Sequence, residues 1–283
     1  MILIADGGST KVDWRLIDKD IEIKQIFTAG MNPFFRAQED ISNEIKHTLL
    51  PEIKKFDIEQ IYFFGAGCNS TEKNEIISNA ITDNVECRHI EVSSDLLAAA
   101  RGLCGNDSGI ACIIGTGSNS SYYDGKEIIT NISPLGYILG DEGSGAVIGR
   151  LFIGACLKNQ LTAGIKEKFL SEYNLTPALI LDKVYRQPMP NRFLASLSPF
   201  VLNHIQDTSV YNLVYNTFKD FLVRNVMQYD NYKHLPAHFT GSVAYHYQAV
   251  LRKVATNLSI TIGNISQSPM AGLIQYYSEI KNT

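Results

Sequence analysis

Apolar positions in the first third of the chain recur alternately with the spacing of strands and of helices. Three apolar runs separated by short turns predict an antiparallel meander of strands at 2–5, 12–17 and 21–27. Beyond the meander, helical spacing alternates with short apolar runs, which is typical of parallel strand pairing. The elements expected there are a helix at 38–50, a strand at 61–65, a helix after 70–72, a strand at 88–92 and a helix at 94–103.

The strand pattern starts again near residue 109. Apolar runs at 109–115, 118–123 and 127–132 predict a second meander, with Asp124-Gly125 as a tight hairpin turn. In each meander the first strand runs into a turn of Gly, Ser and Thr residues that opens the second strand. We interpret the chain as an internal duplication, with the two copies about a hundred residues apart.

The remainder of the chain has mostly helical spacing. The expected elements are a long helix after 141–144, helices at 163–173, 177–185 and 210–229, a strand at 237–240 followed by a helix, a strand at 260–265 and a terminal helix at 269–280. No low-complexity linker separates the two halves. We therefore expect them to meet across a cleft.

Composition supports a folded protein with buried cores. Of 283 residues, 45% are hydrophobic and 19% are charged, and the formal net charge is −4. Neither sign of charge dominates, which disfavours nucleic acid or a membrane surface as the main partner. Five cysteines without a CxxC spacing are typical of reduced thiols, so we expect neither a disulfide framework nor a zinc site. No apolar run approaches the roughly 20 residues of a membrane span, and the first residues lack signal-peptide features, so we expect a cytoplasmic protein.

Two glycine-rich turns carry the first candidate chemistry. In Asp6–Lys11 and in Gly115–Asn119, backbone amides and Ser or Thr hydroxyls are available to phosphate oxygens, and the pair is a more specific signal than either turn alone. Asp6 ends its strand and is a candidate to hold hydrated Mg²⁺. The alternative for each turn is an ordinary hairpin. The chain has no GxxxxGK[ST] motif, and Gly65–Ser70 lacks the last glycine of a dinucleotide fingerprint.

Three more motifs lie where strands meet helices. Asp95 follows a strand and begins a helix, which is where α/β folds place ligands, although a first-turn aspartate also simply stabilises a helix. Gly140–Gly145 places two acids before a helix, and its alternative is helix capping. Thr240–Ala244 is a turn of small residues that admits a flat ring such as adenine, and its alternative is a tight turn.

Taken in this order, the motifs resemble the N-acetylglucosamine kinase family, which belongs with the BadF/BadG/BcrA/BcrD-type ATPases in the sugar kinase, Hsp70 and actin superfamily. The family's first and second phosphate motifs correspond to residues 6–11 and 115–119, and its most distinctive signature to 140–144. Its adenosine motif corresponds to 240–243 and its closing motif to 268–272. The resemblance implies an α/β protein with two ribonuclease-H-like (actin-like ATPase) domains and an interdomain cleft. The domains expected are 1–106 with 268–283, and 107–267 with a helical insertion.

The resemblance also implies roles for single residues. Asp95 matches the general base that acts on a sugar hydroxyl, and ATP with Mg²⁺ is expected in the cleft. Substrate contacts are expected from Asn32, Gly67 and Asp141. ATP contacts are expected from Gly7, Gly8, Ser9, Thr10, Lys11, Gly115, Thr116, Gly117, Ser118, Gly241 and Ser242. The implied reaction is ATP-dependent phosphorylation of an amino sugar, N-acetylglucosamine first, at the 6-hydroxyl, by a homodimer.

One departure leaves the sugar open. Leu135 stands where animal members of the family have a sugar-contacting Trp, so N-acetylmuramic acid, glucosamine or another hexose is an alternative substrate. A second hypothesis is a partner-coupled ATPase of the dehydratase/reductase-activator type, in which cysteines such as Cys104 and Cys112 hold an iron–sulfur cluster. Buried thiols are the simpler interpretation of those cysteines. A non-catalytic sugar sensor is a third hypothesis.

Overall fold

The computed structural model describes residues 1–8, 10–19 and 21–281, and the chain divides into two compact units. Unit 1 comprises Met1–Asp107, Gly125–Glu127 and the C-terminal segment from Pro269. Unit 2 comprises Ser108–Asp124 and Ile128–Ser268. Each unit is built around a sheet of its own.

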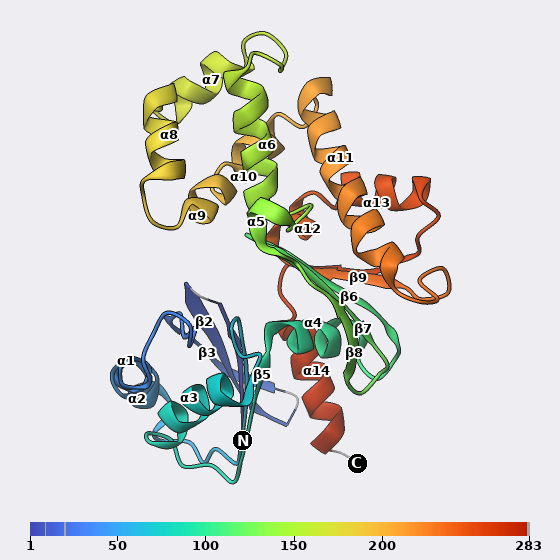
Figure 1. Cartoon of the computed structure of the whole chain (residues 1–283). Helices are drawn as coiled ribbons and strands as arrows, with labels where there is room; N and C mark the ends of the chain where they lie inside the picture. The colour runs from blue at the N-terminus through green and yellow to red at the C-terminus, as the bar shows by residue number, and fades with distance from the viewer. Residues whose placement is uncertain (9, 20, 282–283) are drawn as a thin grey trace. The chain divides into compact units, whose positions relative to one another are not determined.

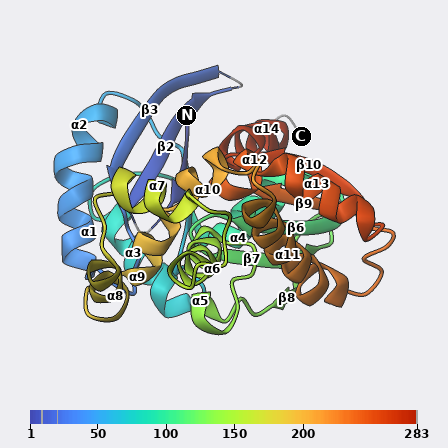
Figure 2. The ribbon, with the colours of Figure 1, turned by 90° about the horizontal axis from the view of Figure 1, so that it is seen from above.

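The sheet of unit 1 has the strand order β3-β2-β1-β4-β5. Its strands are β1 (Ile2–Gly7), β2 (Lys11–Asp18), β3 (Ile21–Ala29), β4 (Gln60–Gly65) and β5 (His89–Ser94). The first three form the predicted antiparallel meander, whose β2 and β3 lie side by side in Figure 2. The other two strands run parallel to β1 and to each other, as predicted.

Residues of β1 alternate between two cores because successive side chains of a strand point to opposite faces. Leu3 and Ala5 are buried with residues of α1 (Gln38–Glu44) and α3 (Thr71–Thr82). Ile2 and Ile4 are buried with residues of α4 (Asp95–Cys104) and α14 (Met270–Lys281). The sheet of unit 1 is thus covered on both faces.

The helix predicted at 38–50 has an irregular middle. It consists of α1, a π-helical turn η1 (Ile45–Leu49) and α2 (Leu50–Ile53). The backbone N–H of Leu50 bonds to the carbonyl of Ile45, five residues back, and Pro51 follows without an N–H of its own. The position of the helix was predicted correctly, but its π turn was not.

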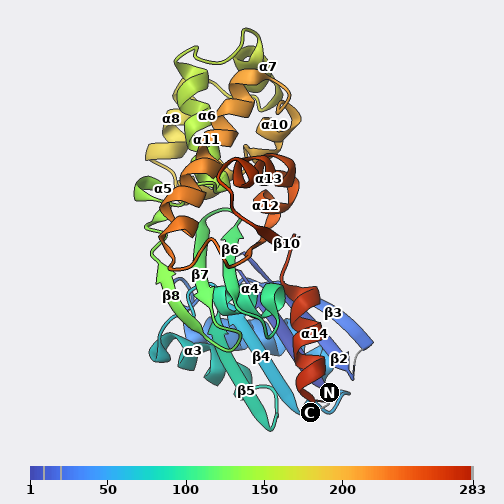
Figure 3. The ribbon, with the colours of Figure 1, turned by 90° about the vertical axis from the view of Figure 1, so that its right-hand side faces the viewer.

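The C-terminal helix packs tightly onto α4 within unit 1, as Figure 3 shows. A Cβ atom on Gly272 would lie 1.7 Å from the carbonyl oxygen of Gly102, so the two helix backbones touch. Small residues are needed on both helices at this crossing. The motif at 268–272 therefore has a packing role in the structure.

The sheet of unit 2 repeats the topology of unit 1. Its order is β10-β9-β6-β7-β8, with the strands β6 (Gly109–Ile114), β7 (Ser118–Tyr123), β8 (Ile128–Ile132), β9 (Ala237–Thr240) and β10 (Ile262–Ser266). Three strands form an antiparallel meander from the central β6, and β9 and β10 add in parallel. The predicted duplication and the fold class of two ribonuclease-H-like domains are confirmed.

Most of unit 2 outside its sheet is helical. Its helices are α5 (Gly136–Leu139), α6 (Gly145–Leu157), α7 (Ile165–Glu172), α8 (Pro177–Tyr185), α9 (Pro190–Ala195), α10 (Ser198–Asn203), α11 (Thr208–Arg224), α12 (Ser242–His246) and α13 (Gln248–Asn257), with a short 3₁₀ turn η2 (Val226–Gln228). In Figure 1, α6 and α11 run side by side. Among the described residues, no helix is long and apolar enough to cross a bilayer.

The helix predicted at 210–229 ends early, at Arg224. The side chain of Asn225 turns inward and donates to the buried Glu142 carboxylate, 3.2 Å away. Beyond it, the Tyr229 hydroxyl lies 2.7 Å from Ser120 Oγ on β7. These tertiary contacts override the helical spacing of the segment.

Candidate active site

The carboxyl edge of the first sheet gathers several predicted site residues. Gly7 pairs with Gly65, and Gly65 pairs with Ser94, so the ends of β1, β4 and β5 form one row. Asp6 lies just before this row, and Asp95 lies just after it. Since the carboxyl ends of parallel strands meet at the same edge of a sheet, unit 1 brings Asp6 and Asp95 to the same edge.

The first glycine-rich turn is a closed hairpin. The Gly8 N–H donates to the Lys11 carbonyl at 2.9 Å, and the Gly30 N–H donates to the Thr10 carbonyl at 3.0 Å. The Lys11 ammonium lies 4.8 Å from the centre of the Phe27 ring, so its side chain runs along the meander. The predicted phosphate contact at Ser9 lies outside the described residues.

Asn32 and Gly67, both predicted to contact the sugar, are neighbours in unit 1. The Asn32 side chain is only 7% exposed, and its Oδ1 accepts a hydrogen bond from the Phe34 backbone at 2.9 Å. A Cβ atom on Gly67 would lie 2.5 Å from that same Oδ1. Gly67 also has φ +89°, a conformation that favours glycine. Glycine is therefore needed to leave room for the amide of Asn32.

If Asn32 binds a sugar as predicted, we expect Gly67→Ala to raise the KM for that sugar about tenfold, because displacing the Asn32 amide removes a hydrogen bond worth about 1–2 kcal/mol. Steady-state kinetics with the sugar varied measures this effect. Gly105→Ala is the matched control: its φ is +61°, but apart from its two chain neighbours no described residue has an atom within 4 Å of the position of its Cβ. An equal rise in KM in both variants would contradict the steric explanation.

Asp95 is the first residue of α4, and the strand before it determines its position. Ser94 caps the helix by accepting from the Leu97 N–H at 3.3 Å, which leaves Asp95 at the mouth of the first turn. Burial raises the pKa of Asp95, although the backbone N–H groups of Leu96 and of Asp95 itself lower it. Burial and the Asp95 charge together raise the pKa of the Cys68 thiol to about 12. A carboxylate with a raised pKa is a better proton acceptor than an ordinary aspartate.

In unit 2, the second glycine-rich turn is anchored by a helix. The Gly115 N–H donates to the Gly117 carbonyl at 2.9 Å, which closes the turn. The first N–H groups of α6 then donate back to it: Gly145 to the Gly115 carbonyl at 2.8 Å, and Ala146 to the Thr116 carbonyl at 3.1 Å. The carbonyl groups of Gly115, Thr116 and Gly117 and the Gly115 N–H therefore fix the shape of the hairpin.

The carboxylate of Asp141 braces the same hairpin. Its Oδ1 accepts from the Ser118 N–H at 3.3 Å, and its Oδ2 lies 3.1 Å from where a Cβ on Gly117 would be. Burial raises the pKa of Asp141 to about 6, the Ser118 hydrogen bond lowers it, and the charge of Glu142 raises it. Asp141 was predicted as a sugar contact. Its contact with the second phosphate hairpin was not predicted.

The neighbouring Glu142 has a structural environment. It is 8% exposed, and its carboxylate accepts from Arg224 Nη1 at 2.5 Å and from Asn225 Nδ2 at 3.2 Å. Both partners lie at the end of α11. Of the two acids in the signature, Glu142 therefore fixes the loop to the helical part of unit 2, while Asp141 faces the hairpin.

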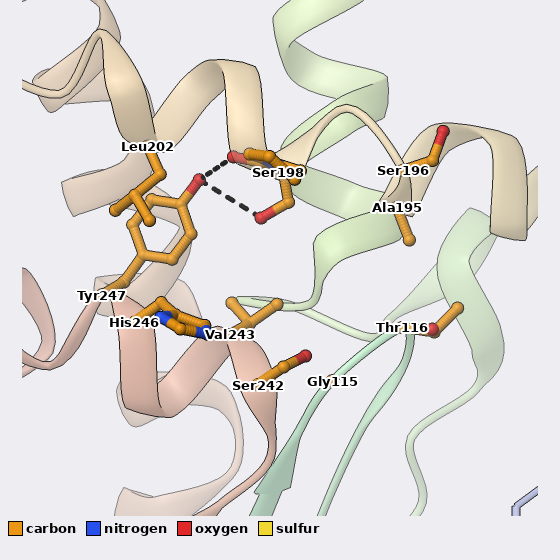
Figure 4. A pocket seen from close by; sticks show the side chains of 11 residues that line it. Gly115, Thr116, Ala195, Ser196, Ser198, Leu202, Ser242, Val243, His246 and Tyr247 are labelled. Atoms are coloured by element: carbon orange, nitrogen blue, oxygen red, sulfur yellow. Dashed lines mark hydrogen bonds between the residues drawn. The ribbon is translucent and has the colours of Figure 1, made fainter. Parts of the chain in front are cut away.

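A pocket of about 390 Å³ opens beside this hairpin within unit 2 (Figure 4). It is lined by Gly115, Thr116, Ala195, Ser196, Ser198, Pro199, Leu202, Ser242, Val243, His246 and Tyr247. Its wall is rigid where the Tyr247 hydroxyl donates to the Ser198 carbonyl at 2.7 Å and accepts from Ser198 Oγ at 3.2 Å. Its size and its mixed apolar and polar lining are typical of a small-molecule site.

The predicted adenosine turn forms the floor of this pocket. Gly241 has φ +113°, and a Cβ atom there would lie 2.4 Å from the Ile114 carbonyl oxygen. The turn therefore packs backbone against backbone on the end of β6, which places Ser242 and Val243 in the pocket lining. The opposite wall comes from α9 and α10. Neither helix was predicted from the sequence, because neither carries a glycine-rich or charged motif.

Residues 5–211 match the family described as BadF/BadG/BcrA/BcrD ATPase. The chain belongs to this ATPase family. It is 26% identical over 209 residues to the N-acetylmuramic acid/N-acetylglucosamine kinase of Clostridium acetobutylicum. The matched segment covers 69% of this chain and 68% of that protein.

Two crystal structures resemble this member of the family. A provisionally assigned N-acetylglucosamine kinase from Porphyromonas gingivalis is 51% identical, covers 99% of both chains and has a TM-score of 0.93. A second such kinase, from Chromobacterium violaceum, is 17% identical over 97% of this chain and 98% of its own, with a TM-score of 0.71, and shows the shared fold.

Among the described residues, the five cysteines of the chain form no disulfide, and four of them are buried. Burial raises the pKa of Cys104 to about 12, so its thiol stays protonated at neutral pH. Among the described residues, no group of three His, Cys, Asp or Glu side chains is arranged to hold a metal ion. Cys104 and Cys112 are both buried, as expected for thiols packed in the protein interior.

Proposed function

We propose that this protein is an ATP-dependent kinase that phosphorylates an amino sugar, N-acetylglucosamine or N-acetylmuramic acid, at the 6-hydroxyl. The observation that carries the proposal is Asp95, a carboxylate of raised pKa at the carboxyl edge of the first sheet. The provisional assignment of the 51% identical relative as an N-acetylglucosamine kinase supports N-acetylglucosamine as a substrate. The name of the Clostridium relative supports both sugars.

Unit 1 supplies the sugar side of the proposed reaction. Asn32 holds sugar hydroxyls, and Asp95 accepts the proton of the hydroxyl that reacts. The sugar oxygen then forms a bond to the γ-phosphorus, the bond from that phosphorus to the bridging oxygen breaks, and ADP leaves with the electron pair. General-base assistance of this kind contributes about 10²- to 10⁴-fold in rate.

Unit 2 supplies the nucleotide side. The pocket lined by Val243 and Tyr247 accommodates the adenosine, and the hairpin at Gly115–Ser118 donates to the phosphates. Because this hairpin is fixed by α6 and by Asp141, its donors are oriented before the nucleotide arrives. Donors that need no reorientation stabilise the charge of the transferring phosphoryl group most effectively.

Asp6 is the residue we propose to hold Mg²⁺. Mg²⁺ is usually bound by one or two protein carboxylates together with phosphate oxygens and water, and a carboxylate near the end of β1 fits that donor set. The ion supplies charge neutralisation for the phosphates. Asp6 keeps the metal close to the edge where Asp95 takes up the proton.

We expect kcat/KM for the sugar to fall on the acid side of neutrality. A general base works only when it is deprotonated. Because burial raises the pKa of Asp95, kcat/KM should begin to fall at a higher pH than it would for an ordinary aspartate, whose pKa is about 4. Asp141, whose pKa is about 6, also loses its charge as the pH falls below neutrality. The pH dependence of kcat/KM measures this. A profile that stays flat down to about pH 4.5 would contradict the assignment of Asp95.

Release of ADP, followed with a coupled assay, tests the proposed function directly. We expect ADP release to require N-acetylglucosamine or N-acetylmuramic acid together with Mg²⁺ and ATP. ADP release that is independent of any sugar would instead support the partner-coupled ATPase.

A further inference from the structure

An exposed aromatic ring adjoins the proposed sugar site of unit 1. Phe34 is 56% exposed, and its Cδ2 lies 2.9 Å from where a Cβ on Gly67 would be. The backbone N–H of Phe34 is bonded to Asn32 Oδ1, so the ring is held beside the amide that we expect to bind sugar hydroxyls. An apolar ring in this position offers a flat face to a sugar or to its substituent.

A cation lies against the same ring. The Lys73 ammonium on α3 is 5.1 Å from the centre of the Phe34 ring and donates to the Pro33 carbonyl at 3.4 Å. Within the described residues, no carboxylate forms an ion pair with Lys73. The nearby Arg36 guanidinium is bound to the carbonyls of Gly30 and Asp40. The loop from Asn32 to Arg36 therefore combines an apolar face with the Lys73 ammonium, although α3 also carries Glu72 in its first turn.

We propose that Phe34 and Lys73 form a subsite for a carboxylate-bearing substituent of the amino sugar and determine the preference for N-acetylmuramic acid over N-acetylglucosamine. The lactic acid ether of N-acetylmuramic acid has the required chemistry: an apolar part to pack on the ring and a carboxylate to meet the ammonium. The inference rests on the proposed function, since it refines the substrate of the same site. Neither residue acts on the reacting hydroxyl.

The test is the ratio of kcat/KM for N-acetylmuramic acid to that for N-acetylglucosamine. Because the ammonium and the carboxylate would meet at a site that is partly exposed to water, we expect Lys73→Met to lower the ratio only about tenfold. Lys73→Arg should restore most of it. The methyl ester of N-acetylmuramic acid, which lacks the charge, should be handled equally well by wild type and Lys73→Met. Phe34→Ala should weaken both sugars.

Lys55 provides a matched control. Its ammonium also lies 5.1 Å from the centre of an aromatic ring, that of Phe56, but it precedes β4 and so lies at the amino end of that strand. Lys55→Met should leave the ratio unchanged. A ratio that is insensitive to Lys73→Met, or a wild type that rejects N-acetylmuramic acid while accepting N-acetylglucosamine, would overturn the subsite.

Binding separates the failure of this inference from the failure of the proposed function. Calorimetric titration of each sugar into wild type and Lys73→Met measures the same preference without turnover. Loss of the preference in Lys73→Met supports the subsite even if no sugar is phosphorylated. An absence of phosphorylation would count against the proposed kinase activity alone. Equal binding of N-acetylmuramic acid by the two proteins would overturn the subsite whatever the kinase activity.

Discussion

Asp95→Asn should lower kcat for the sugar-dependent reaction by about 10²- to 10⁴-fold, with little change in either KM. The asparagine keeps the shape of the side chain and its place at the start of α4, but it cannot accept the hydroxyl proton. Sugar-dependent ADP release at saturating substrate measures the loss. Turnover within about threefold of wild type would remove Asp95 from the role of general base.

The stability of this variant should not fall. Burial raises the pKa of Asp95 in the folded protein, so its charged form is disfavoured there relative to the unfolded chain. A raised native pKa means that Asp95 contributes most to stability at acid pH and that this contribution is lost as the pH rises. Replacing the charge by a neutral amide at neutral pH therefore removes a cost. Thermal unfolding checks this, with Asp83→Asn at the exposed end of α3 as the control.

Gly241→Ala should damage both the stability of unit 2 and the use of ATP. Gly241 has φ +113° and ψ 155°, a region occupied almost only by glycine, and a Cβ there would lie 2.4 Å from the Ile114 carbonyl oxygen. Strain and overpacking together cost about 3 kcal/mol. Because the turn is the floor of the pocket, we also expect the KM for ATP to rise about tenfold, the equivalent of 1.4 kcal/mol.

Gly164→Ala is the control that separates the cost of backbone strain from the cost of a steric clash. Gly164 has φ +91° in the same unit, but apart from its two chain neighbours no described residue has an atom within 4 Å of its Cβ position. We expect a small loss of stability, about 1–2 kcal/mol, and no change in the KM for ATP. Equal KM values for ATP in Gly241→Ala and wild type would contradict the assignment of the pocket to the nucleotide.

Local patterns predicted most of the fold. The two meanders followed from alternating apolar runs and from turns rich in Gly and Asp, since strand pairing between neighbours is decided by a few adjacent residues. The helices that begin after Ser70 and Ser144 were predicted because those side chains cap the next turn. The row of Gly7, Gly65 and Ser94 then follows from parallel pairing.

Contacts between distant segments were not predictable in the same way. The bond from Ser118 to Asp141 joins two elements 23 residues apart, and the pocket wall from α9 and α10 reaches the turn at Gly241 only through the packing of unit 2. The early end of α11 at Arg224 depends on the buried Glu142. No spacing in the sequence encodes these contacts, because each depends on how whole helices pack.

The most direct test of the account is to identify the product made from Mg²⁺-ATP and N-acetylglucosamine, with N-acetylmuramic acid in parallel. Phosphorus NMR of the reaction mixture, quantified against ADP, measures it. We expect one sugar 6-phosphate to be formed for each ADP released, and none with Asp95→Asn. Stoichiometric ADP and inorganic phosphate without any phosphorylated sugar would contradict it.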